Sequence, residues 1–566
     1  MKSQSLPSYS QGAQGKPLLA MTIGQAFDQT AARYPEGEAL VVRHQQRRFT
    51  WGQLAQAVDL YARALLALGL QAGDRLGVWA PNCSEWFICQ FASAKIGVIL
   101  VNINPAYRLS ELEYVLKQSG CQWLVCAAQF KTSDYHSMLE ELLPDIAQYP
   151  VGHLTHERFT ELRGVISLSS QPPAGFLPWS RLATLATGVT LEQFYARQAS
   201  VQADQPVNIQ YTSGTTGFPK GATLSHRNIL NNGYMVGDSL GLTVNDRLVI
   251  PVPLYHCFGM VMGNLGCVAY GTTMIYPSEA FDPGLTLQAV AEERATGLYG
   301  VPTMFIAMLD HPQRASFDLS SLRTGIMAGA TCPIEVMRRV ISEMHMSEVQ
   351  IAYGMTETSP VSMQTGPADD LELRVTTVGR THPLLENKLI DAQGNIVERG
   401  EVGELCTRGY SVMLGYWNNP QATAEAIDSE GWMHTGDLAV MNDQGYVCIV
   451  GRNKDMIIRG GENIYPRELE EFFFTHPAVA DVQIIGIPDQ KYGEEIVAWI
   501  KFHPGHTANE LELQTWCKSR IAHFKTPRHF KFVDAFPMTV TGKTQKFKMR
   551  EVSIQELASQ GLSDPA

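Results

Sequence analysis

The chain has 566 residues, of which 45% are hydrophobic and 18% are charged, and its formal net charge is −12. This length exceeds one ordinary core, so we expect a large body with at least one further domain. The acidic balance argues against a general nucleic-acid binder, which relies on lysine and arginine to contact phosphates. The ten cysteines are scattered, without a CxxC pair or a His/Cys cluster. Their spacing gives no indication of zinc and favours a reduced, cytoplasmic protein.

No targeting segment is predicted at the N-terminus. Residues 3–15 are polar, and no arginine precedes Arg33, whereas a mitochondrial presequence would be rich in arginine. The stretch 248–278 contains no Asp, Glu, Lys or Arg, and its length alone would admit a membrane span. Prolines and glycines such as Pro251 and Gly263 interrupt it. We therefore predict no transmembrane segment, but a buried core strand followed by a pocket-lining helix.

Short apolar runs alternate with segments of helical periodicity along the body of the chain. Strands are predicted at 75–79, 98–102 and 123–127, helices at 84–96 and 109–118, and the alternation returns beyond residue 246. This alternation predicts an α/β fold with parallel layers. Residues 171–202 have the least pattern and are predicted to form an irregular connection.

A second unit is predicted near the C-terminus. An apolar strand at 446–450 runs into the charged break Gly-Arg-Asn-Lys-Asp at 451–455, which suits a domain hinge. Beyond this break we expect helices at 466–475 and 509–521 and strands at 482–487 and 495–502. The predicted organisation is a large N-terminal body over residues 1–453, built of several subdomains, and a small mobile α+β domain over residues 454–566.

Residues 211–221 read Tyr-Thr-Ser-Gly-Thr-Thr-Gly-Phe-Pro-Lys-Gly and carry the chemistry of a polyphosphate site. Glycines allow backbone amides to converge on an anion, hydroxyl groups add donors, and the lysine adds charge. ATP is the expected ligand. The spacing differs from that of the P-loop because Gly221 follows the lysine directly. The candidate nucleotide-binding residues of this run are Thr212, Ser213, Gly214, Thr215, Thr216, Gly217 and Lys220.

This run and the sequence Tyr-Gly-Met-Thr-Glu-Thr at 353–358 resemble the signature motifs of the adenylate-forming (AMP-binding) enzymes. That superfamily includes acyl-CoA synthetases, peptide-synthetase adenylation domains and luciferases. The resemblance extends over nearly the whole chain. It implies that Tyr353, with Gly354, packs on adenine, that Thr356 meets the α-phosphate, and that Glu357 binds Mg²⁺. A carboxylate suits this hard cation, which would bridge the phosphates of ATP.

Further motifs follow in the order that the family has. Gly329, Ala330 and Thr331 resemble the short segment that lies against the nucleotide and the carboxylate substrate. Asp437, in His-Thr-Gly-Asp, and Arg452 match the family's ribose contacts, with a surface salt bridge as the alternative for the arginine.

Three positions in the C-terminal region match residues of the catalytic cycle. Lys543, in Val-Thr-Gly-Lys-Thr, matches the lysine that acts in adenylation. Lys454 matches the hinge between the domains. Gly461 matches the glycine beside the tunnel through which the thiol of CoA arrives.

The resemblance implies that a carboxylate and ATP give an acyl-adenylate and pyrophosphate, but it does not fix the acceptor. Only residues 544–566 follow Lys543, too few for a carrier domain, and residues 254–259 lack the aspartate of amino-acid-activating members. An apolar slot that includes His256, Phe258 and Gly259 would suit an alkyl chain, although ordinary core packing would give the same pattern. Each buried CH₂ of such a chain contributes about 0.8 kcal/mol.

We therefore predict an acyl-CoA synthetase, a fatty-acid–CoA ligase for medium- to long-chain acids that uses ATP, Mg²⁺ and CoA. Two alternatives stay open. One is an enzyme that loads a stand-alone carrier protein, and the other is a non-catalytic protein that binds a nucleotide or acyl-adenylate. Peripheral membrane contact and a homodimer are also left open.

Overall fold

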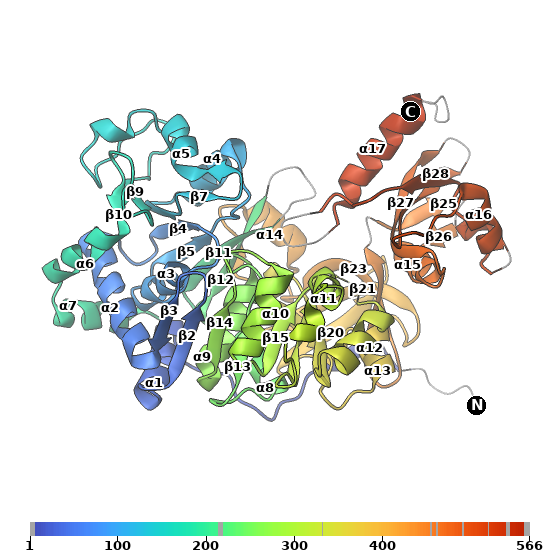
Figure 1. The fold of residues 1–566 in the computed structure, drawn as a ribbon, viewed down its shortest axis with the longest axis horizontal. Helices are drawn as coiled ribbons and strands as arrows, with labels where there is room; N and C mark the ends of the chain where they lie inside the picture. The colour runs from blue at the N-terminus through green and yellow to red at the C-terminus, as the bar shows by residue number, and fades with distance from the viewer. Residues whose placement is uncertain are drawn as a thin grey trace.

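The structure, a computed structural model, describes residues 6–212, 219–330, 332–452, 455–459, 462–489, 492–518, 520–538 and 544–559. Within these ranges, helices cover several β-sheets, and a red-coloured C-terminal module lies at one end of the molecule (Figure 1). The α/β class with parallel layers and a separate C-terminal domain is confirmed.

Two large sheets form most of the body. The eight-stranded sheet has, in spatial order, β10 (Leu177–Pro178), β9 (Gly164–Ser167), β6 (Trp123–Cys126), β4 (Arg75–Trp79), β5 (Ile99–Asn102), β11 (Pro206–Thr212), β12 (Lys220–Ser225) and β22 (Gly415–Tyr416). The nine-stranded sheet has β19 (Arg380–Thr381), β18 (Val361–Gln364), β17 (Glu348–Gly354), β16 (Thr324–Ala328), β15 (Gly297–Gly300), β13 (Arg247–Val249), β14 (Thr273–Tyr276), β2 (Glu38–Val42) and β3 (Arg47–Thr50).

The inner strands of both sheets run parallel. In the first sheet the pairings from β10 across to β11 are parallel, and in the second sheet the pairings from β17 across to β2 are parallel. The carboxyl ends of parallel strands meet at one edge of a sheet, where ligands of open α/β sheets bind. The loops that follow β11, β13, β15, β16 and β17 are therefore the first places to look for a site.

A layer of helices packs against the two sheets and shares one hydrophobic core with them. These helices are α1 (Ile23–Arg33), α2 (Trp51–Ala67), α3 (Ser84–Lys95), α8 (His226–Ser239), the π-helix η4 (Phe258–Leu265) and α9 (Gly266–Tyr270). Every residue of α3 is buried, as expected for a helix enclosed on all sides. The buried ammonium of Lys95 is neutralised by ion pairs with Asp28 and Asp59.

Other helices cover the outer faces of the body or follow its loops. They are α4 (Leu109–Ser119), α5 (Tyr135–Leu142), α6 (Leu182–Leu185), α7 (Leu191–Ser200), α10 (Pro283–Glu292), α11 (Pro302–Leu309), α12 (Ile334–Glu343), α13 (Leu371–Thr376) and α14 (Pro420–Ala426). No described helix is both long enough and apolar enough to cross a membrane.

The prediction of an irregular connection at 171–202 is wrong, because the segment forms the strand β10 and the helices α6 and α7. A capping box closes the N-terminus of α7: Thr190 accepts from the amide of Gln193, and the Gln193 side chain accepts from the amide of Thr190. Only Phe194 of this helix is buried, so its apolar periodicity in the sequence is weak.

A five-stranded sheet completes the body and leads to its C-terminal end. Its strands are β1 (Tyr9–Gln11), β20 (Leu385–Ile390), β21 (Val402–Gly409), β23 (Met433–Met441) and β24 (Val447–Arg452). All of its pairings are antiparallel.

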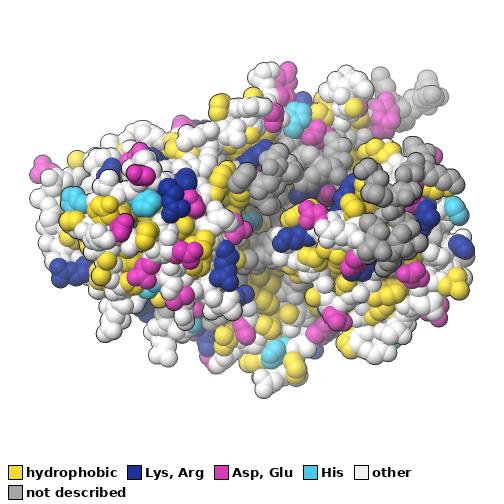
Figure 2. Space-filling view, turned by 90° about the horizontal axis from the view of Figure 1, so that it is seen from above, with side chains coloured by type: hydrophobic (Ala, Val, Ile, Leu, Met, Phe, Trp, Pro, Cys, Tyr) yellow, Lys and Arg dark blue, Asp and Glu magenta, His cyan; other side chains and the backbone are white. Residues whose placement is uncertain are grey.

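Acidic and basic side chains are interspersed over the face of the molecule in Figure 2, and its described residues present no broad patch of one charge.

The C-terminal module has its own sheet and core. Its strands are β26 (Glu462–Ile464), β25 (Ile457–Arg459), β28 (Gly493–Phe502), β27 (Val479–Asp489) and β29 (His529–Phe532), and its helices are α15 (Pro466–Phe474), α16 (Glu510–Lys518) and α17 (Lys546–Ser559). Residues such as Leu469, Phe473 and Ile500 form a core separate from that of the body. The module contacts the five-stranded sheet where the guanidinium of Arg467 donates to the carbonyl oxygen of Ile449 at 2.6 Å.

Candidate active site

The carboxyl edges of the two large sheets meet at a hydrogen bond between Thr212 and Glu357. Thr212 ends β11 in the first sheet, and Glu357 lies in the 3₁₀ turn η6 (Thr356–Thr358), which follows β17 in the second. The hydroxyl of Thr212 donates to Oε1 of Glu357 at 3.3 Å. The start of the predicted phosphate run and the predicted metal ligand, far apart in the sequence, are thus brought together.

Glu357 is held in a buried position by several partners. Its backbone carbonyl accepts from the amide of Met413 at 2.9 Å, and its side chain accepts from the hydroxyl of Tyr416 at 2.8 Å. Among the described residues, both donors to the side chain use Oε1, which leaves Oε2 for a cation. Burial and the neighbouring Glu357 carboxylate raise the pKa of Tyr416 well above its usual range, so the phenol stays a donor.

Lys220 begins β12 and lies beside Tyr416, the donor to the Glu357 carboxylate. Its ammonium is 5.2 Å from the centroid of the Tyr416 ring, within the range of a cation–π contact. Because β22 pairs with β12, with Tyr416 opposite Ala222, the sheet register fixes the phenol next to the lysine strand. Lys220, Tyr416 and Glu357 therefore form one charged group at the edge of the first sheet.

A second group brings together Tyr353, Asp437 and Arg452. The Tyr353 hydroxyl donates to Oδ2 of Asp437 at 2.5 Å, and Nε of Arg452 donates to Oδ1 at 3.0 Å. Asp437 is buried, whereas about half of the Arg452 side chain is exposed. Burial and the Asp437 charge raise the pKa of Tyr353 well above its usual range. Each carboxylate oxygen keeps a lone pair for a ligand hydroxyl, so the geometry suits ribose recognition.

The small residues of the predicted motifs lie at the same edge. Gly354 ends β17, and a Cβ atom there would come within 1.7 Å of the carbonyl oxygen of Pro360, so only glycine fits. Gly329 follows β16 with φ of +90° and, like Ala330, is exposed. These positions leave accessible backbone at the sheet edge from which Thr356 and Glu357 follow.

The predicted acyl-slot residues lie at the start of the π-helix. Phe258 is packed against Tyr299, with ring centroids 5.3 Å apart, and a Cβ atom at Gly259 would lie 2.4 Å from the carbonyl oxygen of Pro253. The Nδ1 atom of His256 accepts from the amide of Phe258 at 3.3 Å. The strand and the helix that were predicted within residues 248–278 are present as β13 and η4.

A cavity of about 340 Å³ opens next to these residues, between the carboxyl edges of the two sheets. Its walls include Pro81 and Pro105 from the first sheet's loops, and Tyr255, Val301 and Met304 from the second's. A Cβ atom on Gly329 would lie 3.2 Å from a methyl group of Val301, so one wall of the cavity adjoins the predicted nucleotide segment. This size is within the usual range for small-molecule sites.

Several predicted site residues lie outside the described residues: Ser213, Gly214, Thr215, Thr216, Gly217, Thr331, Lys454, Gly461 and Lys543. Their roles stay predictions. Met538 and Thr544, on either side of the segment that contains Lys543, are β-bridge partners.

Sequence reasoning missed Tyr416. It lies in no motif, and its link to Glu357 depends on the antiparallel pairing of β22 with β12, which joins residues nearly two hundred positions apart. The aromatic pair Tyr416 and Trp417 after a glycine was the only local signal.

Comparison with known proteins agrees with this geometry. The profile of the "AMP-binding enzyme" family matches residues 27–417, and that of the "AMP-binding enzyme C-terminal domain" matches residues 468–543. The mitochondrial medium-chain acyl-CoA ligase ACSF2 of Homo sapiens is 46% identical over 549 residues, which cover 96% of this chain and 89% of that protein.

Two solved structures share the fold over almost their entire length. The anthranilate CoA ligase AuaEII, in complex with anthranoyl-AMP, has a TM-score of 0.84 at 25% identity, covering 96% of this chain and 99% of that chain. ATP-bound MatB from Rhodopseudomonas palustris has a TM-score of 0.80 at 27% identity, covering 94% of this chain and 99% of that chain. With its motifs assembled at the joined sheet edges, this chain belongs to the family of AMP-binding, adenylate-forming enzymes.

Proposed function

We propose that this protein is an AMP-forming acyl-CoA synthetase that activates an unsubstituted carboxylic acid of medium to long chain. The observation that carries the proposal is the hydrogen bond from Thr212 to Glu357, which joins the glycine-rich run to a buried carboxylate at the edge of the neighbouring sheet. The relatives named as acyl-CoA ligases, at 46% identity over most of the chain, support the choice of acceptor.

The described residues have the chemistry to hold MgATP. Oε2 of Glu357 would contact Mg²⁺, Lys220 would face the phosphates, and Asp437 would accept hydrogen bonds from the ribose hydroxyls. Mg²⁺, when bound, supplies positive charge that offsets the phosphate charge. The burial of Glu357 and its donors Tyr416 and Thr212 hold the carboxylate in one orientation before the cation arrives.

The acyl chain is proposed to occupy the cavity between the sheets. Val301 and Met304 give it apolar walls. Because a Cβ atom on Gly329 would lie 3.2 Å from Val301, the carboxylate end of a bound acid would lie near the proposed nucleotide segment. Met304→Trp should fill part of this space and shift the preferred acid to shorter chains. An unchanged chain-length profile would mean that the chain lies elsewhere, for example in the slot beside His256.

The function is tested by pyrophosphate release and thioester formation across C2 to C18 and aryl acids, with and without CoA. We expect the highest kcat/KM with a medium- or long-chain acid and thioester only when CoA is present. A faster rate with any free amino acid than with octanoate would overturn the specificity. Acyl-adenylate formation without transfer to CoA would favour the carrier-loading alternative, and the absence of turnover would favour a binding protein.

We also propose that the C-terminal module turns about Lys454 between the two half-reactions, because Lys543 must act in the first and a thiol must pass Gly461 in the second. Lys543→Ala should slow adenylate formation by about 10²–10³, the loss expected for one transition-state contact, and spare transfer from supplied acyl-adenylate. Gly461→Leu should do the reverse. Equal losses in both half-reactions for both variants would exclude the alternation.

The proposed location is cytoplasmic. The human relative is named as mitochondrial, so this part of the proposal needs a separate test by fractionation or imaging.

A further inference from the structure

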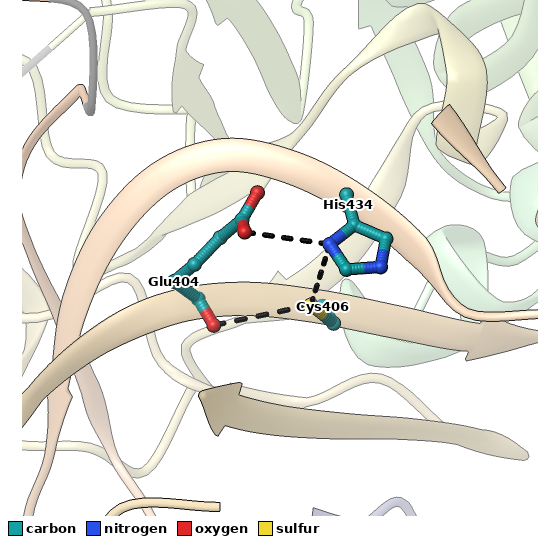
Figure 3. A group of neighbouring side chains, drawn as sticks. All are labelled: Glu404, Cys406 and His434. Atoms are coloured by element: carbon teal, nitrogen blue, oxygen red, sulfur yellow. Dashed lines mark hydrogen bonds and ion pairs between the residues drawn. The ribbon is translucent and has the colours of Figure 1, made fainter. Parts of the chain in front are cut away.

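The side chains of Glu404, Cys406 and His434 gather on the five-stranded sheet, outside the contacts described so far (Figure 3). One potential ligand atom from each lies within 4.8 Å of the other two. Glu404 and Cys406 are two residues apart on β21 and share a face, and His434 is the register partner of Cys406 on β23. No zinc site was predicted from the sequence, because this cluster arises from strand pairing rather than from close spacing along the chain.

His434 presents one nitrogen to two partners. Its Nδ1 atom is 3.3 Å from Oε2 of Glu404 and 3.7 Å from Sγ of Cys406. A ring nitrogen carries either a proton or a lone pair, so it cannot donate to the carboxylate and accept from the thiol at once. The thiol's further acceptor is the carbonyl oxygen of Glu404, at a long 3.9 Å. A cation among the three atoms would satisfy all of them together.

Two of the three separations between the ligand atoms match a tetrahedral zinc ion, and the third, between carboxylate and sulfur, is at most 4.8 Å. Zn–S bonds of about 2.3 Å and Zn–N and Zn–O bonds of about 2.0–2.2 Å place sulfur and nitrogen about 3.6 Å apart, and nitrogen and oxygen about 3.4 Å apart. The structure has 3.7 Å and 3.3 Å for the same pairs. Thiolate, imidazole and carboxylate together suit Zn²⁺ rather than Mg²⁺, which prefers oxygen ligands alone.

The surroundings of His434 resemble the outer shell of a metal site. Its Nε2 atom faces Oδ2 of Asp428 at 3.7 Å, and Oδ1 of Asp428 is fixed by the amides of Glu430 and Trp432, both at 2.9 Å. A carboxylate behind the imidazole is the usual means of orienting a histidine ligand. The Lys388 ammonium opposes the negative charge, but it lies over the Trp432 ring, 4.3 Å from the centroid.

Two of the three side chains are partly exposed to solvent. The side chains of His434 and Glu404 are 30% and 22% exposed, whereas Cys406 is buried. We propose that Glu404, Cys406 and His434 bind one Zn²⁺, with water as the fourth ligand and Asp428 orienting the histidine. The thiol would release its proton on binding.

This site would be coupled to the proposed ribose contact. Oε1 of Glu404 accepts from the amide of Gly436 at 3.1 Å, and the next residue is Asp437. A zinc ion bound to Glu404 and His434 would hold both ends of the segment that presents Asp437. Zinc occupancy should therefore change the KM for MgATP. This effect on KM rests on the proposed function, whereas the binding of zinc to the three side chains is independent of it.

The test is a cobalt titration of the full chain after removal of metals with a chelator. We expect one equivalent of Co²⁺ to bind with a sulfur-to-metal charge-transfer band in the near ultraviolet, and Zn²⁺ to displace it. Cys406→Ser should abolish the band, and Glu404→Gln, which keeps an oxygen for the Gly436 amide, should weaken binding. Asp428→Asn should weaken it by about 10- to 100-fold.

Cys448→Ser is the matched control, because Cys448 lies on the adjacent strand β24 outside the cluster. This variant should bind cobalt as the unchanged protein does. Failure of the unchanged protein to bind an equivalent of cobalt, or a band that survives Cys406→Ser, would overturn the proposal. If Cys406→Ser does not fold, unaltered affinity in both Glu404→Gln and Asp428→Asn would overturn it as well.

Discussion

Removal of a single hydroxyl group, in Tyr416→Phe, tests whether Glu357 is a positioned metal ligand. The phenol donates to the carboxylate at 2.8 Å, and a hydrogen bond to a charged group contributes about 1.5–3 kcal/mol. Thr212 remains as a second donor, but at 3.3 Å it compensates only in part. Taking the low end of the range, we expect the KM for MgATP to rise roughly tenfold. The aromatic ring beneath Lys220 is retained, so the loss reports on the hydroxyl alone.

The assay is pyrophosphate release at varied MgATP with saturating acid and CoA. Tyr416→Leu also removes the cation–π contact with Lys220 and should cost a further two- to fivefold, from about 0.5–1 kcal/mol. Tyr446→Phe is the control, because it loses a comparable phenol–carboxylate hydrogen bond, to Asp369, away from the cluster. Our reasoning is refuted if Tyr416→Phe and Tyr446→Phe leave the same KM for MgATP.

Three further predictions concern the site and the stability of the fold. Glu357→Gln should raise the Mg²⁺ concentration for half-maximal rate roughly tenfold or more, and unchanged rates at limiting Mg²⁺ would contradict the role of the carboxylate. In Gly354→Ala the added Cβ atom would lie 1.7 Å from the Pro360 carbonyl oxygen, so this variant should have a free energy of unfolding lower by about 2 kcal/mol or more in urea titrations. Gly15→Ala is the control and should leave the free energy of unfolding unchanged, because its Cβ atom meets nothing within 4 Å. Burial raises the pKa of Asp481 to about 6, above its unfolded value of about 3.9, so this group favours the folded state fully below about pH 4 and loses that contribution as the pH rises through 6. Asp481→Asn should therefore be the more stable protein at pH 7, by about 1–3 kcal/mol, and equal to the unchanged protein below pH 4; a constant difference across this range would exclude the explanation.

Local patterns predicted the periodic parts of the fold well. The strand expected at 75–79 is β4, and the helix expected at 84–96 is α3. Both have continuous apolar or helix-period sequence that tertiary contacts reinforce. The prediction was wrong for residues 171–202, where only one side chain of α7 is buried and the helix depends on its cap. Weakly buried helices leave little hydrophobic periodicity to detect.

The site could be predicted in its parts but not in its connections. Motif resemblance indicated Thr212, Glu357 and Asp437, and the structure adds that the first two share a hydrogen bond while the third lies with Tyr353. Tyr416 could not be predicted from the sequence, because its role depends on the register between β22 and β12. Pairings between distant strands are set by the packing of whole sheets, which no local pattern encodes.

The three proposed contacts to Mg²⁺, phosphates and ribose come from three different sheets, and this division has a mechanical consequence. Lys220 belongs to the first sheet, Glu357 follows the second, and Asp437 belongs to the five-stranded sheet. The C-terminal module contacts that last sheet, where Arg467 donates to Ile449 on β24, the strand that pairs with the Asp437 strand. A rotation of the module would therefore act first on the ribose side of the nucleotide and leave the phosphate side, held between two packed sheets, in place. Such an arrangement would let an acyl-adenylate stay anchored through its phosphate edge while the module exchanges one catalytic face for another.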